Sequence, residues 1–341
     1  MKRILVLFIS ILVTSAGFTQ QSKAQSVSKA GITAAEFLKI PVGARSTAMG
    51  GATTAISNDL TSMFWNPSGL ADVTTPSAYA EYGDWFIDVN HNYFGFAMPV
   101  GNGVLGANVT ALTMGDFEET TYDNPEGTGR TFNAYSMAVG VTYAQYLLDV
   151  FQIGANVKYV SENISFSSAS GIAFDIGTIY KTPFDDIKFG VSITNVGEKM
   201  TIDGEDLITT TDLADNQQGN YEPDVKLKTD PYDMPMQLKV GVAWDPYVSE
   251  DFRATITVDG NNPSNNVQSI SVGTEIGFMN NLVMLRAGLP ELGLKDRVQE
   301  FAAGMGVKYS LNSSMGIEFD FSYQQYKYLG GVNRISLGLN F

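Results

Sequence analysis

The sequence predicts an all-β protein, a transmembrane antiparallel β-barrel of about fourteen strands with an N-terminal hatch segment. From about residue 77 onward, apolar and polar residues alternate in segments separated by turn-forming clusters. After the first 24 residues, no apolar run reaches the roughly 18 residues that a membrane helix needs. The chain also ends in mid-strand, on "NRISLGLNF", with its apolar side chains on one face.

Residues 1–24 have the pattern of a cleavable secretory signal peptide. Lys2 and Arg3 form a short basic start, and the apolar run from Ile4 to Val13 is too short to span a membrane. Small residues precede Gln25. An exported chain that lacks membrane helices and enters a membrane must form a closed barrel, so we expect it in the outer membrane.

Residues 25–76 do not alternate and are expected to form the hatch. A barrel of about fourteen strands is too wide for its own side chains to fill, because about eight strands already enclose a packed interior. The small residues of "GARSTAMGGA" permit close packing, and Asn66 with Pro67 is expected to turn the chain into the barrel wall. The alternative is a periplasmic tail.

Residues 77–341 are assigned to the transmembrane barrel. In the segment 187–194, Ile187 and Phe189 face one side while Lys188 and Gly190 face the other. The second face is rich in glycine and charge in most segments, which suits a lumen. The expected strands are residues 77–84, 90–100, 103–114, 131–146, 149–166, 168–182, 185–195, 234–246, 251–260, 268–279, 281–290, 299–310, 314–328 and 331–341.

The connections between these strands alternate in length. Those after even-numbered strands are short, whereas residues 115–130 and 196–233 are long and polar. Short periplasmic turns and longer extracellular loops are typical of outer-membrane barrels, and a water-soluble β-sandwich would not explain the asymmetry. Aromatic loop residues are candidate contacts for a protein partner, although they could instead pack on the barrel rim: Trp85, Phe86, Phe117, Tyr122, Tyr221 and Tyr232.

The last strand carries a targeting feature. Phe341, after outward-facing Ile335 and Leu337, resembles the signal by which the outer-membrane barrel-assembly machinery recognises its clients. We expect this strand to close on the first one and to face outer-membrane lipid.

Composition excludes several other functions. The formal net charge of −15 argues against nucleic acid, which needs a basic surface. Without cysteine, disulfides and thiolate metal sites are excluded, and we expect no cofactor or metal. The acidic segments 201–207 and 257–266 lack the full calcium-binding loop pattern, so calcium stays an open alternative. His91, the only histidine, is expected in a loop or at the rim, and no enzyme is predicted.

The stretch from Phe37 to Val73 resembles the N-terminal signature of the PorV/PorQ family of outer-membrane proteins, which share a FadL-like barrel with an N-terminal hatch. The resemblance implies a role in type IX secretion, with three partners: the translocon barrel, the C-terminal signal domains of exported cargo and the surface attachment complex. The chain lacks the extra length of typical PorV proteins, which leaves the subfamily open. The motif residues are Gly43, Ala44, Arg45, Met49, Gly50, Gly51, Trp65, Asn66, Pro67 and Gly69.

Two other functions remain open. A FadL-like transporter of hydrophobic small molecules would need an apolar lumen or pocket, and the expected lumen face is mostly Gly, Ser, Thr, Lys, Glu and Asp. An open porin fits that polarity but does not explain the hatch.

Overall fold

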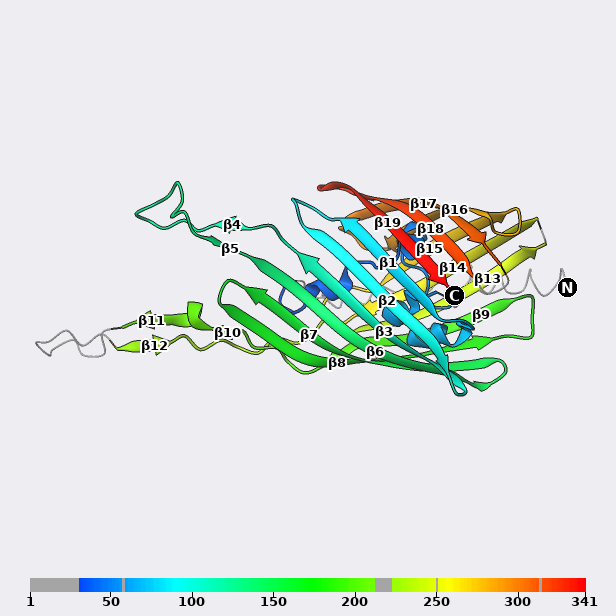
Figure 1. The fold of residues 1–341 in the computed structure, drawn as a ribbon, viewed down its shortest axis with the longest axis horizontal. Coiled ribbons are helices and arrows are strands. Elements are labelled where there is room, and N and C mark those ends of the chain that lie inside the picture. The colour runs from blue at the N-terminus through cyan, green and yellow to red at the C-terminus, as the bar shows by residue number, and fades with distance from the viewer. Residues whose placement is uncertain (1–30, 57–58, 212–222, 250, 313–314) are drawn as a thin grey trace, which may run out of the picture.

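The computed structural model describes residues 31–341 except 57–58, 212–222, 250 and 313–314 (Figure 1). The predicted signal peptide and the beginning of the predicted hatch therefore lie outside the described residues. Within the described ranges, no helix has the length and apolar character needed to cross a membrane.

A closed antiparallel barrel of 14 strands forms the body of the molecule, which confirms the predicted fold class (Figure 1). Strands adjacent along the chain pair with each other, and β1 pairs with β19 to close the wall. The strands are β1 (Ser77–Asp84), β2 (Asn90–Val100), β3 (Gly103–Thr113), β6 (Ala134–Leu148), β7 (Phe151–Ile164), β8 (Ser167–Lys181), β9 (Ile187–Gly197), β13 (Gln237–Val248), β14 (Phe252–Pro263), β15 (Ser269–Phe278), β16 (Val283–Leu292), β17 (Gln299–Ser310), β18 (Gly316–Tyr326) and β19 (Gly330–Asn340).

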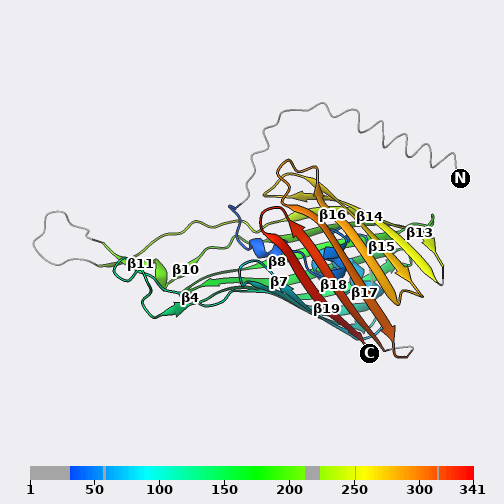
Figure 2. The same cartoon turned by 90° about the horizontal axis from the view of Figure 1, so that it is seen from above.

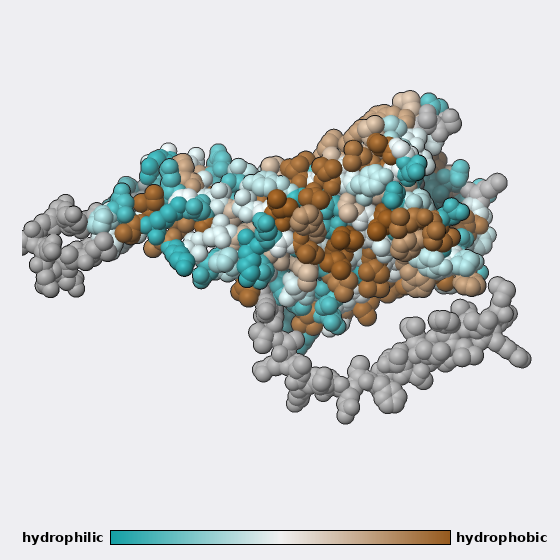
Figure 3. All heavy atoms as spheres, turned by 90° about the horizontal axis from the view of Figure 1, so that it is seen from below, coloured by the Kyte–Doolittle hydropathy of each residue, from teal (hydrophilic) through white to brown (hydrophobic). Residues whose placement is uncertain are grey.

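The two faces of the wall have the expected chemistry. Along β8, Ile172, Phe174 and Ile176 are exposed, whereas Ala173 and Asp175 between them are buried. Figure 3 shows the result as apolar patches spread over the barrel body, with hydrophilic surface on the loops that project from one end. An apolar outer surface of this extent suits contact with lipid rather than with water.

One end of the barrel carries short turns and the other carries longer loops. Beyond the longer-loop end project the hairpin of β4 (Phe117–Glu118) with β5 (Thr131–Phe132) and a second arm (Figure 1). That arm contains β10 (Asp203–Gly204), η3 (Glu205–Leu207), β11 (Ile208–Thr210) and β12 (Asp224–Lys226). In outer-membrane barrels the end with longer loops is extracellular, and we use that orientation below.

One strand boundary differs from the prediction. The strand expected to begin at residue 131 begins at Ala134, because Thr131 and Phe132 pair with β4 in a separate hairpin. The β7–β8 connection, residues 165–166, is short at the extracellular end, as the expected strands 149–166 and 168–182 implied.

The described residues between 31 and 72, called the inner segment below, lie within the barrel (Figure 2). They form η1 (Glu36–Lys39), α2 (Ala44–Ala48), α3 (Ser62–Trp65) and η2 (Pro67–Asp72). Lumen-facing glycines let this segment approach the wall, since a Cβ on Gly154 would collide with the backbone of Pro67 and one on Gly177 with the side chain of Asn66.

Asn66 and Pro67 do not turn the chain into the wall, so that prediction is wrong. Pro67 is the first residue of η2, a position where its missing N–H costs nothing. The Asn66 Oδ1 accepts a hydrogen bond from the Ser68 N–H at 3.2 Å, and its amide donates to the carbonyl oxygens of Thr54 at 2.7 Å and Thr178 at 3.1 Å. The chain reaches the wall only after residue 72.

Candidate functional site

The inner segment lies between two cavities of the lumen. The outer pocket, of about 230 Å³, faces the extracellular end. The inner chamber, of about 570 Å³, opens among the periplasmic turns. Residues that define the outer pocket are Lys39, Trp65, Trp85, Lys239, Glu291 and Tyr326. Residues that define the inner chamber are Arg45, Asp59, Tyr79, Lys308, Glu318 and Asp320.

Aromatic rings give the outer pocket an apolar wall within the polar lumen. Trp65 comes from α3 and is fixed by its Nε1–H, which donates to the Val42 carbonyl oxygen at 2.8 Å. Trp85 follows β1, and its ring meets that of Tyr326 edge-on, with centroids 5.6 Å apart. Rings of this kind bind apolar parts of a ligand, and the Trp and Tyr polar atoms keep them oriented.

Lys239 places an ammonium group at the same pocket. Its side chain comes from β13, and the residue is only 8% exposed. The Nζ lies 4.1 Å from the centroid of the Trp65 ring, a cation–π contact. In the described part of the chain, no carboxylate lies within ion-pair distance of this ammonium, whereas Lys39 is paired with Glu36 at 2.9 Å. Lys239 is therefore free to bind an anionic or hydrogen-bond-accepting group of a ligand.

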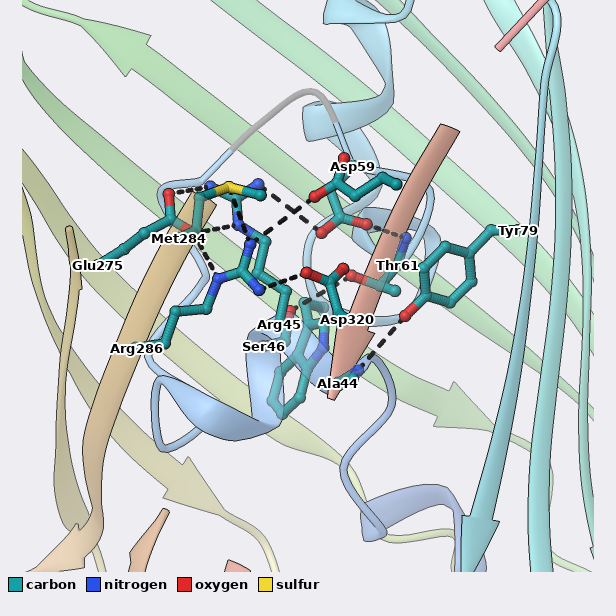
Figure 4. Close-up of polar contacts among 12 residues, drawn as sticks. Ala44, Arg45, Ser46, Asp59, Thr61, Tyr79, Glu275, Met284, Arg286 and Asp320 are labelled. Carbon is teal, nitrogen blue, oxygen red and sulfur yellow. Dashed lines mark hydrogen bonds and ion pairs between the residues drawn. The ribbon is translucent and has the colours of Figure 1, made fainter. Parts of the chain in front are cut away.

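An ion cluster holds α2 against the wall beside the inner chamber (Figure 4). The Arg45 Nε and Nη2 donate to the two carboxylate oxygens of Glu275 on β15, each at 2.8 Å. Arg286 on β16 donates from Nε to the same carboxylate at 2.7 Å, and Arg253 on β14 also pairs with it. Arg286 reaches further to Asp320 on β18.

The charges in this cluster depend on one another. The Glu275 side chain is fully buried and neutralises three guanidinium groups. A buried charge is tolerated only when it is paired and hydrogen-bonded, so loss of this carboxylate would leave Arg45 and Arg286 uncompensated. We call Arg45, Arg253, Glu275, Arg286 and Asp320 the latch cluster.

The opposite side of the inner segment is attached to β6, β7 and β8. Asp72, at the end of η2, accepts hydrogen bonds from the Lys181 Nζ at 2.8 Å and the Gln152 Nε2 at 2.7 Å, and it also pairs with Tyr146. The inner segment is thus held at two sides of the lumen by charged groups.

The predicted hatch residues lie together in the lumen. Ala44 and Arg45 belong to α2, Gly43 and Met49 flank it, and Trp65 lines the outer pocket. Gly50, Gly51, Asn66, Pro67 and Gly69 complete the same inner segment. The signature stretch therefore carries the buried attachment of the segment as well as part of the pocket.

The predicted loop aromatics do not form one surface. Trp85 lines the outer pocket, and Phe86 packs beside it on the Tyr326 ring, with centroids 4.9 Å apart. Tyr122 is fully exposed and Tyr232 is 48% exposed. Phe117 is stacked on Phe132 in the β4–β5 hairpin. Tyr221 lies outside the described residues.

The C-terminal Phe341 lies beside the start of the wall. Its side chain is 48% exposed, and its backbone N–H donates to the Pro76 carbonyl oxygen at 2.9 Å. This placement agrees with an outward-facing terminal residue, and its role in targeting stays a prediction.

His91 is not at the rim, and this prediction is wrong. The residue is fully buried on the lumen face of β2, and its Nδ1 lies 3.2 Å from the Arg334 Nη1. Its alternation with Tyr93 and Ala97, also buried, was the signal in the sequence that could have placed it inside. Lys239 and Glu275 were missed because nothing in a strand pattern distinguishes one lumen-facing charge from another.

Acidic residues of the loops form ion pairs and hydrogen bonds with neighbouring loop and strand residues. Asp203 pairs with Lys226, and Asp206 accepts hydrogen bonds from the Phe166 N–H at 2.8 Å and the Ser167 hydroxyl at 3.1 Å. Among the residues that the structure describes, no group of three or more His, Cys, Asp or Glu side chains is arranged to hold a metal ion.

Solved structures share this architecture. The chain is similar to the Ralstonia pickettii toluene transporter TbuX, with 15% identity, 88% of this chain and 97% of that chain covered, and a TM-score of 0.56. It is similar to the Pseudomonas putida toluene transporter TodX, with 12% identity, 88% and 97% covered, and a TM-score of 0.55. A Pseudomonas aeruginosa FadL homologue matches with 11% identity, 89% and 98% covered, and a TM-score of 0.53.

These likenesses establish a FadL-like outer-membrane barrel fold and, at such low identities, the fold alone. No family model matches the chain, and no curated protein matches it either. The resemblance to the PorV/PorQ family is not supported by these comparisons and stays a prediction.

Proposed function

We propose that the protein is an outer-membrane transporter that takes up small amphipathic molecules, each with an apolar body and an anionic or hydrogen-bond-accepting group. The observation that carries this proposal is the outer pocket, where the unpaired ammonium of Lys239 faces a cavity walled by Trp65, Trp85 and Tyr326. The barrel fold that it shares with two toluene transporters supports the same class of function.

The pocket favours a small ligand. Its volume of about 230 Å³ is below the range of about 300 to 1,000 Å³ that is usual for drug-sized ligands. The polar lumen around it argues against an entirely apolar solute, because Asn261, Gln299 and Ser271 also line the cavity. An aromatic or short-chain acid satisfies both the rings and the ammonium.

The test is a binding measurement on the purified full chain in detergent, by titration calorimetry with benzenesulfonate, whose charge does not change with pH. Lys239→Gln should weaken binding by about ten- to a hundredfold, the cost of losing a hydrogen bond to a charged group of about 1.5 to 3 kcal/mol. Lys308→Gln removes a lysine of the inner chamber and is the matched control.

Equal affinity in Lys239→Gln and the native chain would show that Lys239 does not hold the ligand. If toluene bound and benzenesulfonate did not, the pocket would serve a neutral solute. Absence of binding by both probes, together with unchanged accumulation of either in cells that lack the protein, would reject the transport function.

A second candidate is the role in type IX secretion that the sequence resemblance implies. The observation in its favour is the pair of extracellular arms, β4–β5 and β10–β12, which project beyond the barrel where a protein partner could reach them (Figure 1). Purification from native membranes, with a tag in the β4–β5 hairpin, should recover a translocon barrel or proteins that share a C-terminal signal domain. Recovery of the tagged protein without a translocon barrel and without signal-domain proteins would count against this role.

A further inference from the structure

A file of buried polar side chains runs along the lumen face of four adjacent strands, β18, β19, β1 and β2. Each of these residues is at most 5% exposed. They are Glu81 on β1, His91 on β2, Ser322 on β18, and Arg334 with Ser336 on β19.

Most polar atoms in this file have no partner in hydrogen-bond geometry among the described residues. These atoms are the Arg334 Nε and Nη2, the His91 Nε2, the Ser322 Oγ, the Ser336 Oγ and the Glu81 Oε2. The Arg334 Nη1 forms an ion pair with the Glu81 Oε1 at 3.3 Å and lies 3.2 Å from the His91 Nδ1. The Glu81 carboxylate also interacts with the backbone N–H of Gly43, and the Ser336 hydroxyl interacts with that of Tyr79. Buried polar groups are normally paired, so a concentration of unpaired ones marks a place where another molecule is bound or passes.

The unpaired groups are mainly donors. A guanidinium can only donate, so the His91 Nδ1 must be the acceptor and the ring proton lies on Nε2. Arg334 adds free N–H groups on Nε and Nη2. Glu81 supplies the carboxylate of this file and pairs with one nitrogen of Arg334, so the N–H groups on Arg334 Nε, Arg334 Nη2 and His91 Nε2 are left to bind an acceptor-rich ligand such as a small anion.

The file connects the two cavities. At its outer end the Trp85 ring, which lines the outer pocket, covers Arg334 with 5.3 Å between the guanidinium carbon and the ring centroid. At its inner end Ser336 is paired in register with Asp320, which lines the inner chamber. The lumen-facing residues of β19 therefore lead from one cavity to the other.

Helix α2 covers this file from the lumen side. It packs on β16, β17, β18 and β19, and its residues Ala44, Ser46, Thr47 and Ala48 are small and buried. The Thr47 Oγ1 also has no hydrogen-bond partner in the described part of the chain. We call this contact between α2 and strands β18, β19 and β1 the seam.

The seam differs from the attachment on the opposite wall. There the polar groups of η2 are paired, as in the bond from Lys181 to Asp72. When water or a polar solute enters the seam, unpaired groups gain hydrogen bonds and few are lost, whereas entry at η2 would break existing ones. The seam is therefore a contact that a polar solute can open at a lower cost than the attachment at Asp72.

We propose that small organic anions cross between the outer pocket and the inner chamber along the seam, and that Arg334 is the residue that selects them. The proposal rests on the proposed transport function. The site for the guanidinium is built into the wall, since a Cβ at Gly83 would lie 2.7 Å from the Arg334 Nη1 and 3.0 Å from the His91 carbonyl oxygen.

The first test measures passage of benzenesulfonate into proteoliposomes that contain the full chain, by the rate of osmotic swelling. Arg334→Gln should reduce that rate at least tenfold and leave calorimetric binding at the outer pocket unchanged, while Arg334→Lys should restore part of the rate. Arg130→Gln, which removes an exposed arginine of the β4–β5 hairpin outside the barrel, should keep the native rate. Native protein that binds benzenesulfonate without passing it, or an Arg334→Gln rate equal to the native one, would overturn the seam proposal. Native protein that does not bind the probe would instead remove the proposed function.

The second test ties α2 reversibly to β17, the strand next to the seam, so that α2 cannot move away from the wall. The chain has no cysteine, so introduced pairs are unambiguous. A Cβ at Gly304 on β17 would lie 2.6 Å from the Ala48 Cβ, and one at Gly241 on β13 would lie 2.9 Å from the Thr54 Cβ. Both pairs can relax to the roughly 3.8 Å of a disulfide.

Oxidised Ala48→Cys with Gly304→Cys should stop passage, and reduction should restore it in the same sample, which controls for misfolding. Oxidised Thr54→Cys with Gly241→Cys ties the inner segment to β13, away from the seam strands, and should leave passage intact. Passage that survives the first lock but not the second would place the route elsewhere and overturn the proposal.

Discussion

Replacing Glu275 by glutamine should destabilise the barrel by about 3 to 5 kcal/mol, the usual cost of breaking a buried ion pair. The native carboxylate accepts hydrogen bonds from Arg45, Arg253 and Arg286. Glutamine keeps the shape but offers one oxygen instead of two and directs an NH₂ group at the guanidinium groups. The change therefore removes the neutralising charge and two acceptor positions together.

The magnitude follows from the burial of the three partners. The Arg286 side chain is fully buried and Arg45 is 16% exposed, so water cannot replace the lost carboxylate at either. Arg253 is 28% exposed and should recover part of its solvation. Asp320 still pairs with Arg286, which keeps the expected loss within the range for one buried pair rather than for several.

The assay is urea unfolding of the protein in lipid vesicles, followed by tryptophan fluorescence. Glu119→Gln is the matched control, because its partner Arg130 is 75% exposed and surface pairs contribute little. A loss of less than about 1 kcal/mol in Glu275→Gln, the range of an exposed pair, would refute the argument that the latch cluster depends on this carboxylate.

Three further outcomes are expected. Gly154→Val should push η2 away from β7 and raise single-channel conductance, whereas Gly260→Val, whose Cβ would meet nothing closer than 3.8 Å, should not. Val191→Arg places a charge on the lipid face of β9 and should cost about 2 to 4 kcal/mol in the same urea assay, while a loss near zero would argue against lipid contact there. The Thr128 hydroxyl donates to the Glu119 carboxylate and holds its pKa below the ordinary value. The stability that this interaction gives the β4–β5 hairpin is therefore complete above about pH 4.3 and is lost as the pH falls through the lowered pKa. Loss of hydrogen-exchange protection in the hairpin already at pH 6 would contradict this.

The wall could be predicted from the sequence because its signal is local. Period-two alternation assigns each residue to lipid or lumen without knowledge of any other strand, and β1, β2 and β17 have the expected bounds of 77–84, 90–100 and 299–310. The presence of a segment inside the barrel followed from the width of the lumen. Neither the strand assignment nor the expectation of an inner segment depends on which lumen residues contact each other.

The candidate site could not be predicted because its contacts cross the lumen. Arg45 and Glu275 lie 230 positions apart in the sequence. Lys239 on β13 and Trp65 on α3 are likewise far apart in the sequence, although their side chains are in contact. Alternation gives the face of a strand but not the path of α2 and α3 between the strands. His91 shows the same limit at a strand end, where the pattern is shortest and the residue was wrongly expected at the rim.

The position of the inner segment also constrains how the barrel is made. The segment precedes β1 in the chain, yet its contacts reach as far as the last strand, β19. A wall that closed first would have to admit Arg45 and Asp72 afterwards through a lumen already lined by their partners. The sheet is better assembled around its own N-terminus, with the β1–β19 junction formed last. The wall strands then assemble on the inner segment as a template. Substitutions within the segment should therefore first impair formation of the β1–β19 junction.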